Sequence, residues 1–336
     1  MANKMPELDV VLSCRVRLAR NYEDIPFTAT MSPEWAEETV RRARQAVENC
    51  KTGDYQCYLM KELSGDARSQ LVEHHLISYD LLKFPEISAA LIRGDESVSV
   101  MVNEEDHLRI QALMPGMQPE EAARLAFEAD DALSTAGNYA FDPQFGYLTS
   151  CPTNTGTGMR ASAMLHLPAL TITNRISAVI QAISKLGLTV RGLYGEGSDA
   201  RGCLYQLSNQ VTLGRSEEDI VKTLVAATTQ LAAQERSVRN QLREQDAMGL
   251  YDRLMRSIGL MANARVMGAV EFMQRYSDLR MAVSMDMVDA HLTDVDGMMM
   301  DLQNASLNIF AQHDMNDRER DILRADRLRE RIKNLS

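Results

Sequence analysis

Two short segments of the chain combine residue types that suit the transfer of a phosphoryl group. Residues 103–109 (NEEDHLR) supply paired carboxylates and an arginine. Residues 151–162 (CPTNTGTGMRAS) supply a cysteine followed by hydroxyls, a glycine-punctuated loop and another arginine. The sequence contains no Walker A loop, no HRD or DFG segment and no GxSxG elbow. If this chain moves a phosphate, arginines must hold it.

The two segments resemble the guanidino (phosphagen) kinases, and three further segments fit that family in the same order. They are residues 13–17 (SCRVR), 191–197 (RGLYGEG) and 205–214 (YQLSNQVTLG), so the resemblance covers residue 8 to about residue 240. More specifically, the chain resembles the bacterial protein arginine kinases of the McsB type. That match depends on residues 320–325 (RDILRA), which are similar to the RDxxRA motif of that subfamily.

The composition is that of a globular protein, with 336 residues, 45% hydrophobic and 25% charged. A net charge of −11 argues against general affinity for nucleic acid. No apolar run is long enough for a membrane span, and the N-terminus lacks an apolar signal core. Five scattered cysteines without a CxxC pair suit a reducing compartment, so we expect a cytoplasmic protein.

Apolar periodicity predicts mixed strands and helices. The expected strands are residues 8–14, 56–61, 97–103, 144–150, 188–194 and 203–208, and the expected helices are 33–49, 119–135 and 173–186. From Ser216 onward only helical patterns follow, and methionines gather at 281, 285, 287, 298, 299 and 300, which favours a core or a dimer interface.

These patterns predict an α+β or α/β class. The resemblance implies a curved antiparallel sheet flanked by helices, followed by an all-α C-terminal domain. We place a guanidino kinase catalytic domain at residues 1–243 and a helical domain for dimerisation and phosphoarginine sensing at residues 244–336. A homodimer is the expected assembly.

A guanidinium must lose a proton and be held in line before it can attack phosphorus, and carboxylates can do both. The candidates are Glu105, preferred over Glu104 by resemblance, and Glu196. A solvated acidic turn is the alternative for the NEED segment taken alone. Cys151 is the third catalytic candidate, because a thiolate beside the acceptor would stabilise its charge; Thr153 and nearby amides would lower its pKa. A buried, inert cysteine is the alternative.

Arg15 and Arg17 lie two apart on a predicted strand and therefore share one face. By resemblance, five arginines bind the triphosphate of ATP and His75 contacts the nucleotide, although any one arginine alone reads more simply as a surface salt bridge. Arg20 falls outside the match and is expected to be structural. The full set of expected ATP-binding residues is Ser13, Cys14, Arg15, Val16, Arg17, His75, Arg109, Arg160, Ala161, Ser162, Ala163, Met164, Arg191, Gly192, Leu193, Tyr194 and Gly195. Mg²⁺ should accompany ATP, held mainly by phosphate oxygens, since the sequence offers no metal-ligand cluster.

The subfamily motif implies an allosteric phosphoarginine pocket. Arg320 and Arg324 are neighbours on one face of a helix, and Asp321 and Ala325 complete the motif. A solvated charged helix is the alternative.

The resemblance predicts a protein arginine kinase that transfers the γ-phosphoryl group of MgATP to arginine side chains, in stress response and protein quality control. Implied partners are the ClpC–ClpP protease, a heat-shock repressor and an activator protein, with no nucleic acid and no membrane. One rival is a kinase for free arginine or another small guanidine. The SCRVR motif begins at residue 13, so we expect the N-terminal helical domain of those enzymes to be absent, which counts against this rival. The other rival is a non-catalytic phosphoarginine-binding adaptor.

Overall fold

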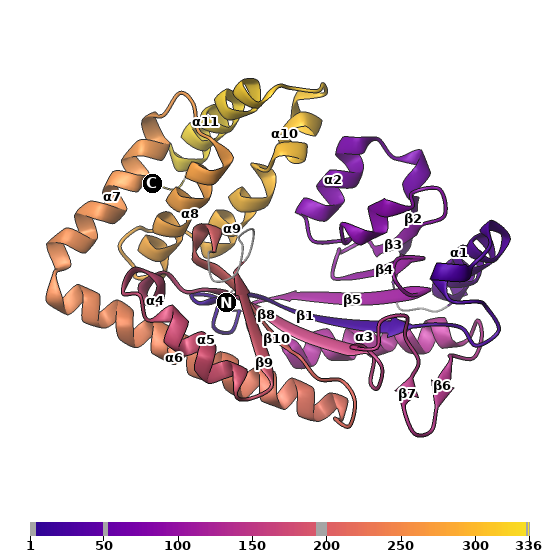
Figure 1. Ribbon diagram of the computed structural model, residues 1–336. Coiled ribbons are helices and arrows are strands. Elements are labelled where there is room, and N and C mark those ends of the chain that lie inside the picture. The colour runs from indigo at the N-terminus through magenta and orange to yellow at the C-terminus, as the bar shows by residue number, and fades with distance from the viewer. Residues whose placement is uncertain (1–4, 50–52, 193–199, 334, 336) are drawn as a thin grey trace. The chain divides into compact units, whose positions relative to one another are not determined.

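The computed structural model describes residues 5–49, 53–192, 200–333 and 335. Eight strands of this part form one sheet in the order β2-β3-β4-β5-β1-β8-β10-β9 (Figure 1). Neighbours from β2 through β5 to β1 pair antiparallel, and β6 and β7 form a separate hairpin. The strands are β1 (Val11–Arg20), β2 (Tyr55–Leu59), β3 (Ala89–Arg93), β4 (Val98–Val102), β5 (Leu108–Pro115), β6 (Phe141–Asp142), β7 (Gly146–Tyr147), β8 (Met159–His166), β9 (Leu188–Gly192) and β10 (Leu204–Asn209).

Helices account for most of the remaining described residues. They are α1 (Pro33–Asn49), α2 (Gly65–Glu73), α3 (Pro119–Ser134), α4 (Pro168–Ile172), α5 (Ile176–Ser184), α6 (Glu217–Gln245), α7 (Ala247–Asn263), α8 (Ala269–Ser284), α9 (Leu292–Asp301), α10 (Asn304–Ala311) and α11 (Asp317–Lys333), with short 3-10 turns η1 (Thr28–Thr30), η2 (Met60–Glu62), η3 (Asp80–Lys83) and η4 (Arg201–Cys203). None of the described helices has the length and apolar character that a bilayer crossing requires.

Contacts divide the chain into two compact units. One contains residues 13–163 and 208–226, and the other contains residues 1–12, 164–207 and 227–336. The predicted domain boundary between residues 243 and 244 falls near the end of α6 and stays a prediction.

Strands supply much of the core of the first unit, and some of them are buried on both faces while others are buried on one face only. β4 is buried throughout, whereas β1 buries Val16 and Leu18 and turns Arg15 and Arg17 to the other face. α3 begins with proline at N1 and acidic residues in its first turn, both of which favour a helix start. It packs on β5 and on α1.

The second unit is dominated by packed helices, with α7 against α8 and α11 (Figure 1). Its core includes the fully or almost fully buried Met261, Phe272, Tyr276 and Met298. Met281 and Met299 are also buried, so the methionine-rich stretch supplies core residues, as predicted.

Within this second unit, side chains of α6 and α8 form hydrogen bonds with the residues just before β1. Arg280 is completely buried and donates hydrogen bonds to the carbonyl oxygens of Leu8 (2.7 Å) and Asp9 (3.1 Å). Its other donors reach Asp296 at 2.7 Å. Arg236 forks the Asp9 carboxylate from α6. These guanidinium hydrogen bonds anchor the N-terminal segment to helices that lie more than two hundred residues further along the sequence.

Candidate active site

The NEEDHLR segment is the connection between β4 and β5. Asn103 adopts the left-handed conformation (φ 60°) that asparagine tolerates better than most residues. Its backbone N–H donates to the His107 carbonyl oxygen at 2.9 Å and closes the loop. Its side-chain amide donates to the carbonyls of Ala36 and Ile87 and ties the loop to its surroundings. The loop is therefore held in one shape from both sides.

The two glutamates of this loop have different environments. Glu104 is buried, accepts two bonds from Arg109 Nη1 (2.9 and 2.8 Å) and accepts a third from Ser78 Oγ at 2.5 Å. Glu105 is exposed, and its pKa is raised by partial desolvation and by the charges of Asp106 and Glu104. Glu104 is thus a structural partner of an arginine, while Glu105 is free to meet a substrate and is more basic than an ordinary glutamate.

Asp106 links the glutamate loop to the cysteine loop. Its Oδ1 accepts hydrogen bonds from the Ser150 backbone N–H (2.7 Å) and from Asn21 Nδ2 (2.7 Å), and the residue is only 2% exposed. Glu105 and Cys151 therefore each lie one residue from a direct hydrogen bond between their loops. Asp106 was not among the predicted site residues, although its place between Glu105 and His107 in the motif was a usable signal.

Cys151 lies in a turn whose oxygens and hydroxyls are closely connected. Its Sγ lies 3.0 Å from Thr153 Oγ1, and its carbonyl accepts from Thr149 Oγ1 at 2.8 Å. Thr212 Oγ1 donates to the carbonyls of Thr153 and Thr155 and fixes the far side of the turn. The predicted contact between Cys151 and Thr153 is present, and the thiol is half-buried rather than sealed in the core.

The glycines of this loop serve close packing. At Gly156 (φ 118°) a Cβ would lie 2.6 Å from the Thr212 carbonyl oxygen, and at Gly158 (φ 63°) it would lie 2.7 Å from that of Ala19. Both positions also require a backbone conformation that favours glycine. The loop can approach β1 and residue 212 only because side chains are absent at these positions.

Four arginines of β1, β5 and β8 lie close enough to repel one another. Burial lowers the pKa of Arg17 well below its usual range, and the charges of Arg15, Arg109 and Arg160 lower it further. The pKa of Arg15 falls to about 10, through burial first and then through Arg109. Arg17 Nε is buried and has no hydrogen-bond partner in the part of the chain that is described. An anion with several oxygens would relieve both the repulsion and the orphaned donor, so the cluster fits a triphosphate.

His75 lies beside this cluster and is held by Gln111. The Gln111 amide donates to the His75 carbonyl at 2.7 Å, and its oxygen accepts from Arg15 at 3.5 Å. Burial and the nearby Arg15 charge lower the pKa of His75 to about 4, so the ring is neutral near pH 7. A neutral ring can contact a nucleotide without adding to the charge repulsion. Gln111 was missed by sequence reasoning, although it lies two residues from Arg109 on the same strand face.

Comparison with known proteins identifies the family. Residues 37–238 match the model of the ATP:guanido phosphotransferase C-terminal catalytic domain, which covers more than half of the chain. The chain belongs to this family. Residues 247–336 match the model of the protein-arginine kinase McsB C-terminal domain. Together the two matches confirm the family and the phosphotransferase class that the motifs predicted.

Curated relatives align over almost the whole chain. A protein-arginine kinase of Caldanaerobacter subterraneus subsp. tengcongensis is 43% identical over 95% of this chain and 95% of its own length. One from Desulforamulus reducens is 46% identical over 98% of this chain and 94% of its own length. The chain is thus a member of the protein-arginine kinase branch of the family.

Solved structures confirm the predicted fold class. Lombricine kinase superposes with a TM-score of 0.61 at 22% identity, covering 72% of this chain and 71% of that one. The duplicated taurocyamine kinase of Schistosoma mansoni gives a TM-score of 0.62 at 24% identity, covering 82% of this chain and 40% of that one. Both share the phosphagen-kinase fold.

The other family-motif positions of β1 and β8 form the scaffold of the cluster. Ser162 Oγ donates to the Arg15 carbonyl at 3.4 Å, and Asn209 Oδ1 accepts from the Ala161 backbone. Burial raises the pKa of Cys14 to about 12, so this residue is a neutral thiol. Of the remaining motif residues, Ser13, Val16 and Ala163 belong to the first unit, and Val16 and Ala163 are completely buried. Met164 packs against the core of the second unit.

Arg20 is structural, as predicted for a residue outside the family match. It is 1% exposed, forks Asp130 at 2.8 and 3.0 Å, and stacks on the Tyr147 ring with its guanidinium carbon 3.6 Å from the centroid. His107 is also structural: its Nδ1 accepts from the Tyr22 backbone, and its other nitrogen lies 2.8 Å from the Pro26 carbonyl. Neither residue points to catalysis.

Some predicted site residues belong to the second unit or fall outside the described residues, and their roles stay predictions. Arg191 and Gly192 end β9 in the second unit. Leu193, Tyr194, Gly195 and Glu196 fall in 193–199, outside the described residues, so the second carboxylate stays a prediction. The described residues contain no group of three or more histidine, cysteine or acidic side chains that would hold a metal ion.

The RDILRA residues lie on α11, and the two arginines differ sharply. Arg324 is completely buried and donates to the Leu302 and Met267 carbonyls (2.9 and 2.8 Å), and also to Asp321 and Asn304 (2.6 Å each). Ala325 is buried too, whereas Arg320 is partly exposed and donates to the Met315 carbonyl at 2.7 Å. Arg324 is therefore an anchor of the helix, and Arg320 and Asp321 are the members within reach of solvent.

Proposed function

We propose that this protein transfers the γ-phosphoryl group of MgATP to arginine side chains of proteins. The observation that carries the proposal is the cluster of Arg15, Arg17, Arg109 and Arg160, whose mutual repulsion calls for a polyanion. Glu105 belongs to the same unit and is exposed, and its pKa is raised. Membership of the protein-arginine kinases supports the choice of acceptor.

In this mechanism the arginine cluster binds the triphosphate and neutralises the charge that spreads over the transferred group. Glu105 forks the acceptor guanidinium and accepts its proton as the nitrogen–phosphorus bond forms. The bond between the γ-phosphorus and the bridging oxygen breaks, ADP leaves, and the product is a phosphoramidate. We assign Glu196 a second contact with the guanidinium, and Cys151 the stabilisation of its charge. Mg²⁺ would be held mainly by phosphate oxygens and water.

A transfer assay tests the proposal directly. The chain is incubated with MgATP and either free arginine or an unfolded arginine-rich protein, and products are followed by phosphorus NMR and mass spectrometry. Acid-labile phosphate on protein arginine, with none on free arginine, is expected. Phosphate on free arginine would move the chain to the small-guanidine kinases. An absence of transfer to both would contradict the proposal.

Two variants separate an enzyme from a phosphoarginine-binding adaptor. Glu105→Gln and Glu196→Gln keep size and remove the base, so transfer should fall by about 10² to 10⁴-fold while ATP still binds. An adaptor would bind phosphoarginine equally well in all three proteins. Full transfer by both variants would contradict the mechanism.

The finer roles follow from the subfamily resemblance. We propose that Arg320 and Asp321 present a phosphoarginine site on α11 and that Arg324 and Ala325 hold the helix in position. We further propose a cytoplasmic homodimer that marks proteins for a ClpC–ClpP type protease in stress response, acts on a heat-shock repressor and responds to an activator protein.

A further inference from the structure

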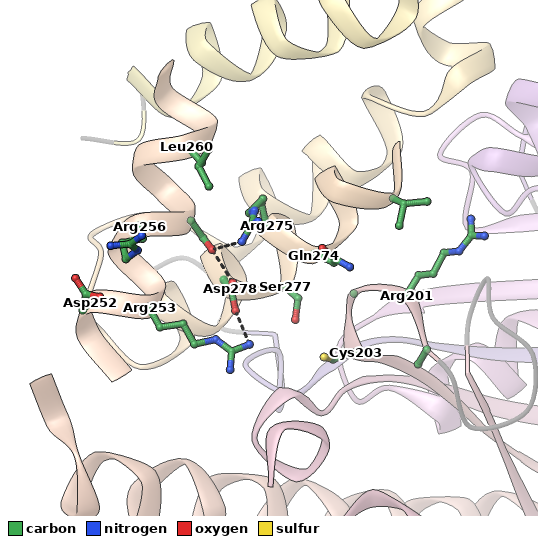
Figure 2. A pocket seen from close by; sticks show the side chains of 14 residues that line it. Arg201, Cys203, Asp252, Arg253, Arg256, Leu260, Gln274, Arg275, Ser277 and Asp278 are labelled. Atoms are coloured by element: carbon green, nitrogen blue, oxygen red, sulfur yellow. Dashed lines mark hydrogen bonds and ion pairs between the residues drawn. The ribbon is translucent and has the colours of Figure 1, made fainter. Parts of the chain in front are cut away.

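An arginine-lined pocket of about 760 Å³ opens in the second unit between α7, α8 and η4. Four arginines line it, against two aspartates: Arg201, Arg253, Arg256 and Arg275 with Asp252 and Asp278. Figure 2 shows Arg201 at one side of the pocket and Arg253 and Arg256 at the other. None of these residues belongs to the family motifs discussed above. The lining has an excess of positive charge in a protein whose net charge is −11.

A hydrogen-bonded network joins several residues that line the pocket (Figure 2). Ser257 Oγ donates to Asp278 at 2.6 Å and accepts from Arg275 Nη1 at 3.3 Å, while Arg253 reaches Asp278 at 3.3 Å. Ser257 and Asp278 are buried. Of the four arginines, two are therefore positioned by one buried aspartate and its serine, which fixes where their remaining donors lie.

The positive charge of the lining is only partly compensated. Arg201 and Arg256 are exposed and make no hydrogen bond or ion pair with any described residue. Arg275 Nε is buried without a partner within the described residues, and its nearest acid, Glu271, lies 3.7 Å from Nη2. Guanidinium groups in this condition favour carboxylate or phosphate oxygens.

The lining of the pocket is not only charged. Leu260 and Val270 are exposed in it, and apolar side chains suit a polypeptide better than an isolated ion.

We propose that this pocket binds acidic side chains of the protein substrate, an inference that depends on the proposed function. The arginines are spread over three elements rather than aimed at one point, which suits several carboxylates of an extended segment. Asp278 and Asp252 oppose a compact dianion more strongly than single carboxylates. The pocket thus favours substrate segments that carry several acidic side chains.

Binding without ATP tests the pocket separately from transfer. Two labelled peptides carry one arginine flanked either by glutamates or by glutamines, and fluorescence anisotropy measures their dissociation constants for the full chain. The glutamate peptide should bind about tenfold more tightly at low ionic strength, and added salt should reduce the difference. Equal affinities, or displacement by millimolar inorganic phosphate with no preference for glutamate, would overturn the proposal.

Matched variants locate the effect. In the double variant Arg201→Gln and Arg256→Gln, the preference should fall about fivefold or more with the glutamine peptide unaffected. Arg243→Gln removes one exposed arginine of α6 outside the pocket and should keep the preference. Arg256→Glu leaves three positive and three negative side chains in the lining, so the preference for the glutamate peptide should disappear. An undiminished preference in the double variant would place the acidic site elsewhere.

The same peptides with MgATP keep the two proposals distinguishable. If neither peptide is phosphorylated but the binding preference stands, the proposed function fails and the pocket remains. If both are phosphorylated equally and bind equally, the kinase stands and the pocket inference fails.

Discussion

Asp106 accepts a hydrogen bond of 2.7 Å from the Ser150 backbone N–H, and so ties the loop of Glu105 to the loop of Cys151. The same oxygen accepts from Asn21 Nδ2, so one buried carboxylate sets the relative positions of three segments of the first unit. Preorganisation of this kind is what positions catalytic groups within a fraction of an ångström.

Asp106→Ala should therefore impair catalysis more than folding. It leaves two donors without their acceptor, which costs about 1–3 kcal/mol of the free energy of unfolding. Misplacement of Glu105 and Cys151 should lower kcat/KM for protein arginine by about 100-fold. Asp142→Ala is the control, because Asp142 caps the neighbouring hairpin through Gln144 and Phe145 and should leave kcat/KM unchanged. Equal effects of the two variants would contradict the role given to Asp106.

The adjacent glutamates should separate stability from catalysis. Glu104→Gln weakens a buried pair with Arg109 and should lower the free energy of unfolding by about 3 kcal/mol. Glu105→Gln changes an exposed residue, so its thermal midpoint should stay close to that of the parent while transfer falls. Thermal unfolding and the rate of phosphoryl transfer are measured on both variants, and each measurement should be affected mainly in a different variant. The same ranking in both measurements would be inconsistent with this division.

Arg17→Met should stabilise the nucleotide-free protein while weakening nucleotide binding. The substitution removes a charge that Arg15, Arg109 and Arg160 oppose, together with an orphaned buried donor. We expect the free energy of unfolding to rise by about 1 kcal/mol and the dissociation constant for ATP to rise about tenfold or more. Urea unfolding and calorimetric ATP titration measure the two effects. Arg41→Met on α1 is the control, since Arg41 is exposed and pairs only with neighbours on its own helix.

His75 should make the protein sensitive to acid. Its pKa is about 4 in the folded protein against a usual 6.5, so the folded state binds fewer protons than the unfolded state between these values. The stability contribution is complete above pH 6.5 and is lost as the pH falls toward 4. His75→Asn tolerates the left-handed backbone (φ 60°) and removes the titrating ring. The variant should lose about 2 kcal/mol less stability than the parent between pH 6.5 and 4.5; identical urea midpoints across this range in both proteins would refute the assignment.

The two motif arginines of α11 should differ in their effect on folding. Arg324→Met leaves Asp321, Asn304 and two backbone carbonyls without their donor and should cost about 3–5 kcal/mol. Arg320→Gln should cost less than about 1 kcal/mol because Arg320 is partly exposed. Thermal unfolding compares them, and Arg318→Gln, an exposed change on the same helix, sets the baseline. A loss of stability in Arg324→Met no larger than that of Arg318→Gln would show that the buried hydrogen bonds of Arg324 are not needed for folding.

Sequence patterns predicted the elements that have a clear local signal. The helix at 33–49 matches α1, because Ser32 and Pro33 mark its start and apolar residues recur at helical spacing. Residues 97–103 and 203–208 match β4 and β10 to within one residue. Strand β8 was missed, since its alternation of Arg160 and Ser162 with small apolar residues looks weak without the neighbouring strands.

The expected strand at 144–150 was mostly wrong, and the reason is local. Only Gly146–Tyr147 pair as β7. Thr149 and Ser150 instead direct their donors to the Cys151 carbonyl and to Asp106. The first of these bonds is a local turn that competes with strand pairing, and the second joins residues 44 positions apart, which a short window of the sequence does not reveal.

The candidate site was predictable in residue type but only partly in arrangement. Motif resemblance located the arginine cluster, Glu105 and Cys151. It did not reveal that Glu104 is buried against Arg109, nor that Arg324 is saturated by backbone carbonyls. Those facts depend on burial, which the charge pattern of a helix or loop does not encode.

The hydrogen bonds between Arg280 and the N-terminal segment affect the order in which the protein can fold during synthesis. Leu8 and Arg280 are separated by 272 positions, and the bond between them exists only after α8 has been made. At typical rates of about 5–20 residues per second, the entry to β1 waits roughly 15 to 50 s for its partner. A chain truncated after α6 would leave the ribosome with the carbonyls of Leu8 and Asp9 lacking the guanidinium of Arg280. The C-terminal helices are thus needed to complete the packing of the segment that leads into β1, although they are synthesised last.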